Sequence, residues 1–253
     1  MRLAAFALLV TVLAGAKDKK APAASTEELA AIAARGRMLY DCDQAAWHAS
    51  DALQTTNPPK EKMGRYIAYK TGDVWVVSFG HLNEQKDGFL EYYQVAPKAD
   101  IQKYIVKSLE PAKVDTGFLL FAARAIDTSL SDFRGEWRPY NTAVLPADEG
   151  RIYVYVFPAQ TRDDIVPLGG DVRYLISPDG LQIIDKRQMH KTILEISRKG
   201  PGETVAQAHN HVLSDVPEDT DVFHALSNHL PEFVGAGGHV YGVELDGRIR
   251  VIN

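Results

Sequence analysis

Apolar residues recur at three- and four-residue steps over residues 26–53, which is the spacing of a helix with one buried face. Ser25 or Thr26 can cap the start of this segment, and the prolines at 58–59 follow its end. Because glycine weakens a helix, we expect Gly36 to break or kink the segment into two helices. The apolar stripe of the second helix consists of Leu39, Cys42, Ala46, Ala49 and Leu53.

The next block of the chain has the pattern of β-strands. Residues 65–69 and 74–79 are rich in β-branched and aromatic side chains, and the turn residues 70–73 between them predict a hairpin. Residues 89–95 predict a third strand, and the mostly apolar residues 118–130 predict a largely buried helix.

In the C-terminal half, residues 172–184 and 240–252 alternate between apolar and polar positions, which is typical of strands with one buried face. Both segments turn through an Asp-Gly pair, the signal of a tight hairpin. Antiparallel hairpins mixed with separate helices indicate an α+β fold. We therefore expect N-terminal helices with a small antiparallel sheet, and a C-terminal antiparallel or mixed sheet with one main helix. The expected C-terminal elements are a strand at 151–157, hairpins at 172–184 and 240–252, a strand continuing over 183–196, a strand at 204–211 and a helix at 217–228.

The N-terminus has the three parts of a secretory signal peptide. Arg2 is a short basic region, residues 3–13 are apolar, and the small residues Ala14–Ala16 suit a signal peptidase. The apolar run is shorter than the roughly 20 residues that span a bilayer. A buried N-terminal helix is the alternative. We expect cleavage after Ala16, no membrane anchor afterwards, and a periplasmic or secreted protein.

This signal peptide (1–16) heads the expected domain organisation. A polar, Pro/Ala-containing linker covers residues 17–25, a helical part with a small sheet covers 26–135, and a β-rich part covers 140–253. The net charge of the whole chain is -5, and it becomes -6 once the single basic residue of the signal peptide is removed. An acidic chain without a basic patch argues against a nucleic-acid partner. An envelope protein or peptide is the expected partner.

Several polar residues form a stripe on the predicted N-terminal helix, and a solvated helix face accounts for them. Trp47 beside His48 marks either a binding surface or a buried contact between helices. Cys42 is the only cysteine, so an intramolecular disulfide is excluded. The polar stripe itself consists of Asp41, Gln44, His48 and Asp51.

The densest group of metal-binding residue types follows the strand at 204–211. His209 and His211 are two positions apart, so on a strand both imidazoles point to the same face. Asp219 and Asp221 lie in the first turns of the next helix, and His224 lies one turn beyond Asp221. Two histidines and one carboxylate can hold a zinc ion with one open position, which is the arrangement of catalytic zinc sites.

A simpler interpretation of the same residues stays open. Asp215 and Glu218 have the spacing of a helix capping box, with aspartate in place of serine or threonine. Acidic residues at a helix N-terminus are stabilised by the helix dipole. In that interpretation the acids start the helix, and the two histidines are polar residues on an open sheet face.

Residues 205–252 resemble the JAMM-type metallopeptidases. The resemblance lies in a strand ending in His-x-His, a helix start with a Pro-Glu-Asp turn, and a Gly-rich return into a hairpin. It implies that His209 and His211 hold zinc together with an aspartate. By local sequence that aspartate is Asp219, and by spacing from the histidines it is Asp221.

The chain departs from the JAMM pattern at several positions. Val212 stands in place of the usual proline, and Val216 stands in place of the serine that assists the reaction. The general base of the family is an upstream glutamate, for which Glu195 and Glu203 are candidates without a local motif. Two functions therefore stay open. One is an exported, non-catalytic envelope binding protein with a degenerate JAMM-like part, and the other is a zinc-dependent hydrolase of the peptidase or isopeptidase type.

Overall fold

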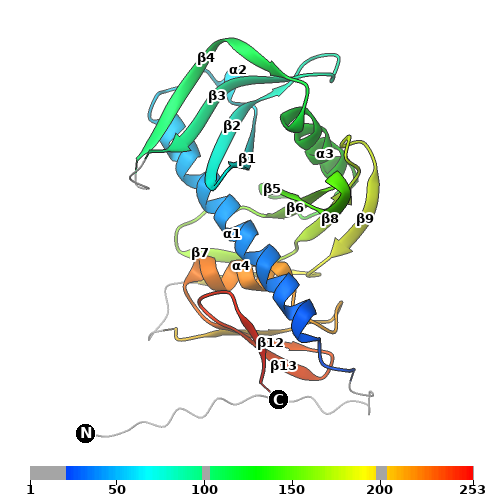
Figure 1. Cartoon of the computed structure of the whole chain (residues 1–253). Helices are drawn as coiled ribbons and strands as arrows, with labels where there is room; N and C mark the ends of the chain where they lie inside the picture. The colour runs from blue at the N-terminus through cyan, green and yellow to red at the C-terminus, as the bar shows by residue number, and fades with distance from the viewer. Residues whose placement is uncertain (1–20, 99–102, 198–203, 253) are drawn as a thin grey trace, which may run out of the picture.

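The computed structural model describes residues 21–98, 103–197 and 204–252 of the chain. One long helix, α1 (Thr26–Gln54), runs through the molecule from the C-terminal sheet to the first sheet (Figure 1). Three four-stranded sheets are arranged one after another along this helix.

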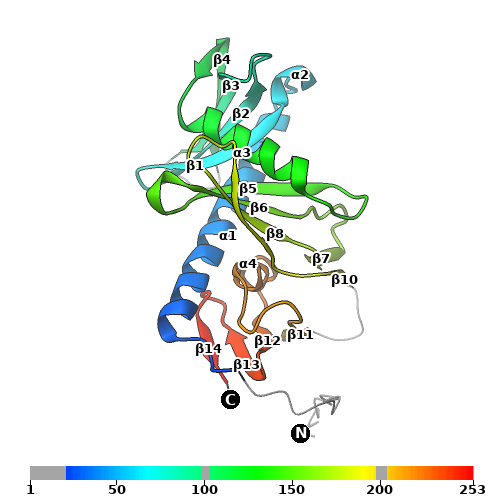
Figure 2. The same ribbon diagram turned by 90° about the vertical axis from the view of Figure 1, so that its right-hand side faces the viewer.

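The first two sheets are antiparallel, and α3 (Phe118–Asp132) lies between them (Figure 2). The buried face of α3 joins side chains of both sheets in one apolar core cluster, including Phe89 of the first sheet and Val154 of the second. In spatial order, the first sheet consists of β1 (Arg65–Thr71), β2 (Val74–Leu82), β3 (Phe89–Pro97) and β4 (Tyr104–Asp115), and the second of β5 (Tyr140–Pro146), β6 (Ile152–Pro158), β8 (Val172–Ile176) and β9 (Ile183–Gln188). The short helix α2 (Lys60–Met63) precedes β1, and a 3-10 turn, η1 (Asp148–Gly150), joins β5 to β6.

The C-terminal sheet is mixed, and α4 (Asp219–Asn228) packs between it and α1 (Figure 2). Its first two strands are parallel and its other neighbours are antiparallel. In spatial order the strands are β11 (Gln207–Asn210), β12 (Glu232–Ala236), β13 (His239–Val243) and β14 (Ile249–Val251). A separate antiparallel pair is formed by β7 (Ile165–Gly169) and β10 (Ile193–Ser197).

The expected α+β class is therefore confirmed, with a small antiparallel sheet first and a mixed sheet at the C-terminus. The expected boundary between residues 135 and 140 falls in the connection from α3 to β5. One core cluster combines α1 and the first sheet with Tyr155, Phe157 and Phe223 from the other side of that boundary.

Gly36 does not divide the first helix, so that expectation is wrong. α1 is continuous, and Gly36 is buried where α4 crosses it. A Cβ at this position would lie 2.5 Å from the carbonyl oxygen of Asp219 and 2.5 Å from the Cβ of Val222. The absence of a side chain at Gly36 thus allows α1 and α4 to approach closely. The local sequence pattern does not reveal this contact.

The single strand expected over residues 183–196 is also wrong. β9 ends at Gln188, and the chain resumes as β10 at Ile193 on a different partner strand. Residues 189–192 between the two strands contain no glycine or proline, so no turn residue marks the change of sheet. His190 lies in the resulting loop.

The C-terminal helix begins at Asp219 instead of Pro217, and its capping box is shifted by one turn. Glu218 is the N-cap, and the Asp221 carboxylate accepts a hydrogen bond from the Glu218 N–H at 2.7 Å. Asp215 is therefore not the helix cap that its spacing suggested.

No helix among the described residues is long and apolar enough to span a membrane. The expected signal peptide, residues 1–16, lies outside the described residues, as do residues 17–20 of the expected linker.

Candidate metal centre

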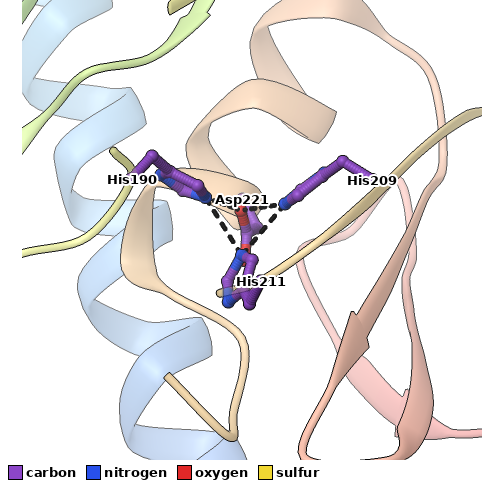
Figure 3. Close-up of side chains that lie close together, drawn as sticks. All are labelled: His190, His209, His211 and Asp221. Atoms are coloured by element: carbon purple, nitrogen blue, oxygen red, sulfur yellow. Dashed lines mark hydrogen bonds and ion pairs between the residues drawn. The ribbon is translucent and has the colours of Figure 1, made fainter. Parts of the chain in front are cut away.

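Four side chains from three separate segments converge beside α4 (Figure 3). His190 comes from the loop between β9 and β10, and His209 comes from β11. His211 follows directly after β11, where its N–H donates to the carbonyl of Gly235 at 2.7 Å. Asp221 lies in the first turn of α4. The four donor atoms all lie within 4.8 Å of one another.

The spacing of these donors matches that around a small metal ion. The Nε2 atom of His211 lies 2.9 Å from that of His209 and 3.0 Å from that of His190. Asp221 Oδ1 lies 3.0 Å from His190 Nε2 and 3.3 Å from His209 Nε2. Zinc–nitrogen bonds of 2.0–2.1 Å in a tetrahedron place ligand atoms about 3.3–3.4 Å apart. An expansion of a few tenths of an ångström would therefore accommodate zinc.

The outer nitrogens of two of these imidazoles are held by carboxylates. His190 Nδ1 lies 2.8 Å from Asp171 Oδ1, and His209 Nδ1 lies 3.0 Å from Glu232 Oε1. An ionised carboxylate only accepts hydrogen bonds, so the proton of each neutral imidazole belongs on Nδ1. Each Nε2 then presents its lone pair to the centre of the group. Carboxylate–histidine pairs of this kind orient metal ligands in proteins.

The third imidazole is held by the backbone. His211 Nδ1 donates to the carbonyl of Val216 at 2.9 Å, and Ser214 Oγ lies 3.0 Å from the same nitrogen. In their neutral forms, all three histidines are therefore fixed in the tautomer that directs the Nε2 lone pair inward. Without a cation or protons between them, three converging lone pairs would repel one another.

The buried carboxylates of the site also require a compensating positive charge. The side chains of Asp171, Asp221 and Glu232 are at most 1% exposed, and buried anions need a compensating charge. Burial alone would lower the pKa of His190, but Asp171 and Asp221 raise that pKa to about 11. Burial opposes protonation of His209 too, but hydrogen bonding to Asp221 and Glu232 raises its pKa to about 9. Protons on the imidazoles or one divalent ion can supply the missing charge.

One carboxylate oxygen of Asp221 is free for such an ion. Oδ2 accepts the capping hydrogen bond, whereas Oδ1 is buried and faces the Nε2 atoms of His190 and His209 at 3.0 and 3.3 Å. Burial would raise the pKa of this carboxyl, but the three surrounding histidines hold that pKa well below its usual range. Asp221 therefore presents an ionised oxygen to the three nitrogens, where it could serve as a metal ligand.

Asp219, the other candidate carboxylate, belongs to a different cluster. It forms ion pairs with Arg35 of α1 and with Arg173 of β8, and it accepts a hydrogen bond from Tyr155 at 2.8 Å. These contacts use both of its carboxylate oxygens. Of the two alternatives, the structure thus places Asp221, and not Asp219, with His209 and His211.

His224 lies beside the group and does not join it. Its ring centroid is 6.5 Å from that of His190, and it is not among the four converging donors. Burial lowers its pKa to about 4, so this imidazole is neutral.

Of the two candidates for the general base, Glu195 is the one among the described residues. Glu195 in β10 is exposed and pairs with Arg138 at 3.3 Å. Glu203 lies outside the described residues. Val216 supplies its backbone carbonyl to His211, so this position supports a ligand without any side-chain hydroxyl.

His190 is the one donor that sequence reasoning did not single out. It precedes His211 by 21 residues and stands at the break between two strands. A lone histidine within an apparently continuous strand carries no local motif. Only the change of sheet partner after β9 directs it to the other three donors.

The site opens onto a small groove with a volume of about 100 Å³. The side chains of His190 and His209 are 13% and 17% exposed, whereas those of His211 and Asp221 are at most 1% exposed. Apolar side chains form much of the wall, among them Leu194 and Leu213. The accessible side of the donor group therefore faces a mainly apolar surface.

No protein-family model, curated protein or solved structure matches this chain. The conclusions about its function therefore depend on the geometry of the site.

Proposed function

We propose that this protein binds one divalent transition-metal ion through His190, His209, His211 and Asp221. The observation that supports this most strongly is the inward direction of three Nε2 atoms whose Nδ1 atoms are each paired with an acceptor. A cluster of surface histidines would have no reason to share this orientation.

Zinc is the metal that we propose first. Three imidazole nitrogens and one carboxylate oxygen are common zinc donors, and their spacing is close to the edge of a zinc tetrahedron. Imidazole also suits copper, iron and nickel, so the availability of metals in the cell contributes to the choice.

Four protein donors favour a binding function over a catalytic one. A catalytic zinc ion keeps one position for water or substrate, whereas four protein ligands complete a tetrahedral shell. His190 supplies a fourth donor in addition to the three that the JAMM resemblance implies. We therefore propose an exported, non-catalytic metal-binding protein that is periplasmic or secreted.

N-terminal sequencing tests the export of the protein. The sequence of the exported protein should begin at Lys17, and an intact Met1 in that fraction would contradict the proposed signal peptide.

A metal-dependent hydrolase of the peptidase or isopeptidase type is the second candidate. It is supported by the partial exposure of His190 and His209 at the groove, which leaves one side of the donor group accessible. A bound zinc ion would supply Lewis-acid chemistry there. The protein's own contribution would be an apolar wall for the substrate and the orientation of each imidazole. Zinc-dependent cleavage of an unstructured peptide that is lost in His209→Ala would favour this candidate.

Metal content tests the proposal. Protein purified without chelators and dialysed against zinc should contain about one ion per chain by elemental analysis. The variant His209→Ala should lose at least nine-tenths of it. His48→Ala is the matched control, because His48 is an exposed histidine on α1 outside the donor group, and it should retain the wild-type content. Wild-type protein without stoichiometric metal, or equal content in both variants, would contradict the proposal.

A further inference from the structure

A second and larger cavity lies on the other side of His224. This cleft is bounded by α1, by the segment from β6 to β7, and by α4. Its volume is about 1080 Å³, compared with about 100 Å³ for the groove at the metal centre. Small-molecule sites usually have volumes of roughly 300–1000 Å³, so the cleft can admit an organic ligand. The buried ring of His224 lines both cavities.

The cleft is acidic. Asp43 and Asp51 of α1 and Asp163 of the β6–β7 connection line it, and none of the described residues in its wall is a lysine or an arginine. Its other polar groups are mainly side-chain amides and hydroxyls, which can accept hydrogen bonds from a cation. The amides belong to Gln44, Gln54, Asn141, Gln160 and Asn228.

Asp43 is the residue that points most directly to a ligand. Its carboxylate forms no hydrogen bond or ion pair with any described residue, although burial raises its pKa to about 6. At neutral pH the group is therefore mostly ionised. A charge that is withdrawn from water without a partner is costly, and a cation in the cleft would offset that cost.

Two further polar groups in the wall are also without hydrogen bonds among the described residues. The hydroxyl of Ser227 is buried without a partner, and the imidazole of His224, which is 6% exposed, forms none. Both lie on α4, whereas Asp43 lies on α1. Unpartnered polar atoms in the wall of a cavity of this size are available to a bound molecule.

Aromatic side chains complete the wall. Trp47 is 56% exposed, so the alternative that it is buried between helices is wrong, and its ring stacks on His48 with the centroids 5.0 Å apart. Phe157 and Phe223 lie deeper, with ring centroids 5.2 Å apart. The face of an aromatic ring attracts an organic cation, and tryptophan does so most strongly.

We propose that this cleft binds the ammonium group of an organic ligand, with Asp43 as its counter-ion. Carboxylates, amide oxygens and accessible aromatic rings, without a competing lysine or arginine, form a suitable environment for an alkylammonium ion. The ligand is either a free amine or the lysine side chain of a peptide, since both present the same group. This site is separate from the metal centre and does not depend on a bound ion.

Matched probes test the chemistry directly. In calorimetric titrations of the full chain, 1,4-diaminobutane should bind at least tenfold more tightly than 1,4-butanediol, which has the same length without charge. The peptide Gly-Lys-Gly forms a second arm. Stronger binding of the diamine would identify a free amine as the ligand, and stronger binding of the peptide would identify a lysine side chain. If neither cation binds better than the diol, the proposal is wrong.

Two variants, one that removes a negative charge from the wall of the cleft and one that adds a negative charge to it, locate the site. Asp43→Asn keeps the shape of the side chain and removes its charge, so affinity for the preferred cation should fall at least tenfold. Gln44→Glu adds a carboxylate to the same wall and should raise that affinity. Asp185→Asn is the matched control, because Asp185 is exposed on β9 away from the cleft, and it should have no effect. Unchanged affinity in both Asp43→Asn and Gln44→Glu, with circular dichroism confirming that each is folded, would overturn the proposal.

Discussion

At the scale of single residues, two aspartates in one helical turn have different partners. Asp219 and Asp221 are two positions apart. A step of two positions along a helix rotates the side chain by about 200° around the helix axis. Asp219 consequently pairs with arginines, whereas Asp221 faces the histidines. The sequence indicated that one of these two aspartates lies with the histidines. The residue at which the helix begins determines which of them it is.

The two aspartates should therefore respond differently to the same substitution. Asp221→Asn should weaken zinc affinity at least tenfold, because it removes the charged ligand oxygen. Asp219→Asn should retain zinc but lose about 3–5 kcal/mol of unfolding free energy, as expected when a buried ion pair loses one partner. Zinc titration and urea unfolding of both variants measure this contrast. A reversed pattern would mean that Asp219 holds the ion.

Glu232 should affect metal binding without touching the ion. It lies 3.0 Å from His209 Nδ1 and is 1% exposed. Loss of such an outer partner typically reduces metal affinity about 10–100-fold. We expect Glu232→Gln to do so in a competition titration with a zinc chelator. Glu244→Gln is the control, because Glu244 pairs with arginines away from the site. Equal affinities in the two variants would show that Glu232 does not orient a ligand.

At the scale of elements, the sequence was most informative where one periodicity belonged to one element. The α1 stripe, the β1–β2 hairpin and the placement of His209 and His211 together follow from spacing alone. The same reasoning failed where the position of an element depends on its tertiary partner. β9 and β10 were predicted as one strand, and for this reason His190 was not recognised as a candidate metal ligand. Gly36 was interpreted as a helix break, because the helix α4 that packs against it is distant in sequence and could not be foreseen.

The crossing of α1 and α4 gives a prediction for Gly36→Ala. In an exposed helix this change would stabilise the protein by about 1 kcal/mol. Here the added methyl group would lie 2.5 Å from the backbone of Asp219, so we expect a net loss of about 1–3 kcal/mol. Urea unfolding measures the sign. A stabilised variant would mean that the two helices are not in close contact.

At the scale of the whole molecule, α1 is the common support. It packs on the first sheet, on β5 of the second sheet, and on α4 of the C-terminal part. The metal centre adds a second connection, because its donors come from the β9–β10 loop, from β11 and its end, and from α4. A bound ion would thus tie the second sheet to the C-terminal sheet.

Metal removal should therefore lower the thermal stability of the entire chain. A ligand present at 1,000 times its dissociation constant stabilises the folded state by about 4.1 kcal/mol. We expect a chelator to lower the unfolding midpoint of the zinc-loaded protein, and added zinc to restore it. The His209→Ala variant should respond to neither reagent. A wild-type midpoint that is insensitive to chelator would show that no ion supports the fold.

The most direct test of the central claim is anomalous diffraction at the zinc absorption edge from crystals of the zinc-loaded protein. We expect one strong anomalous peak enclosed by the Nε2 atoms of His190, His209 and His211 and by Asp221 Oδ1. Its distances to the nitrogens should be about 2.0–2.1 Å. A peak bound elsewhere, or no peak among these four side chains in fully loaded protein, would contradict the account.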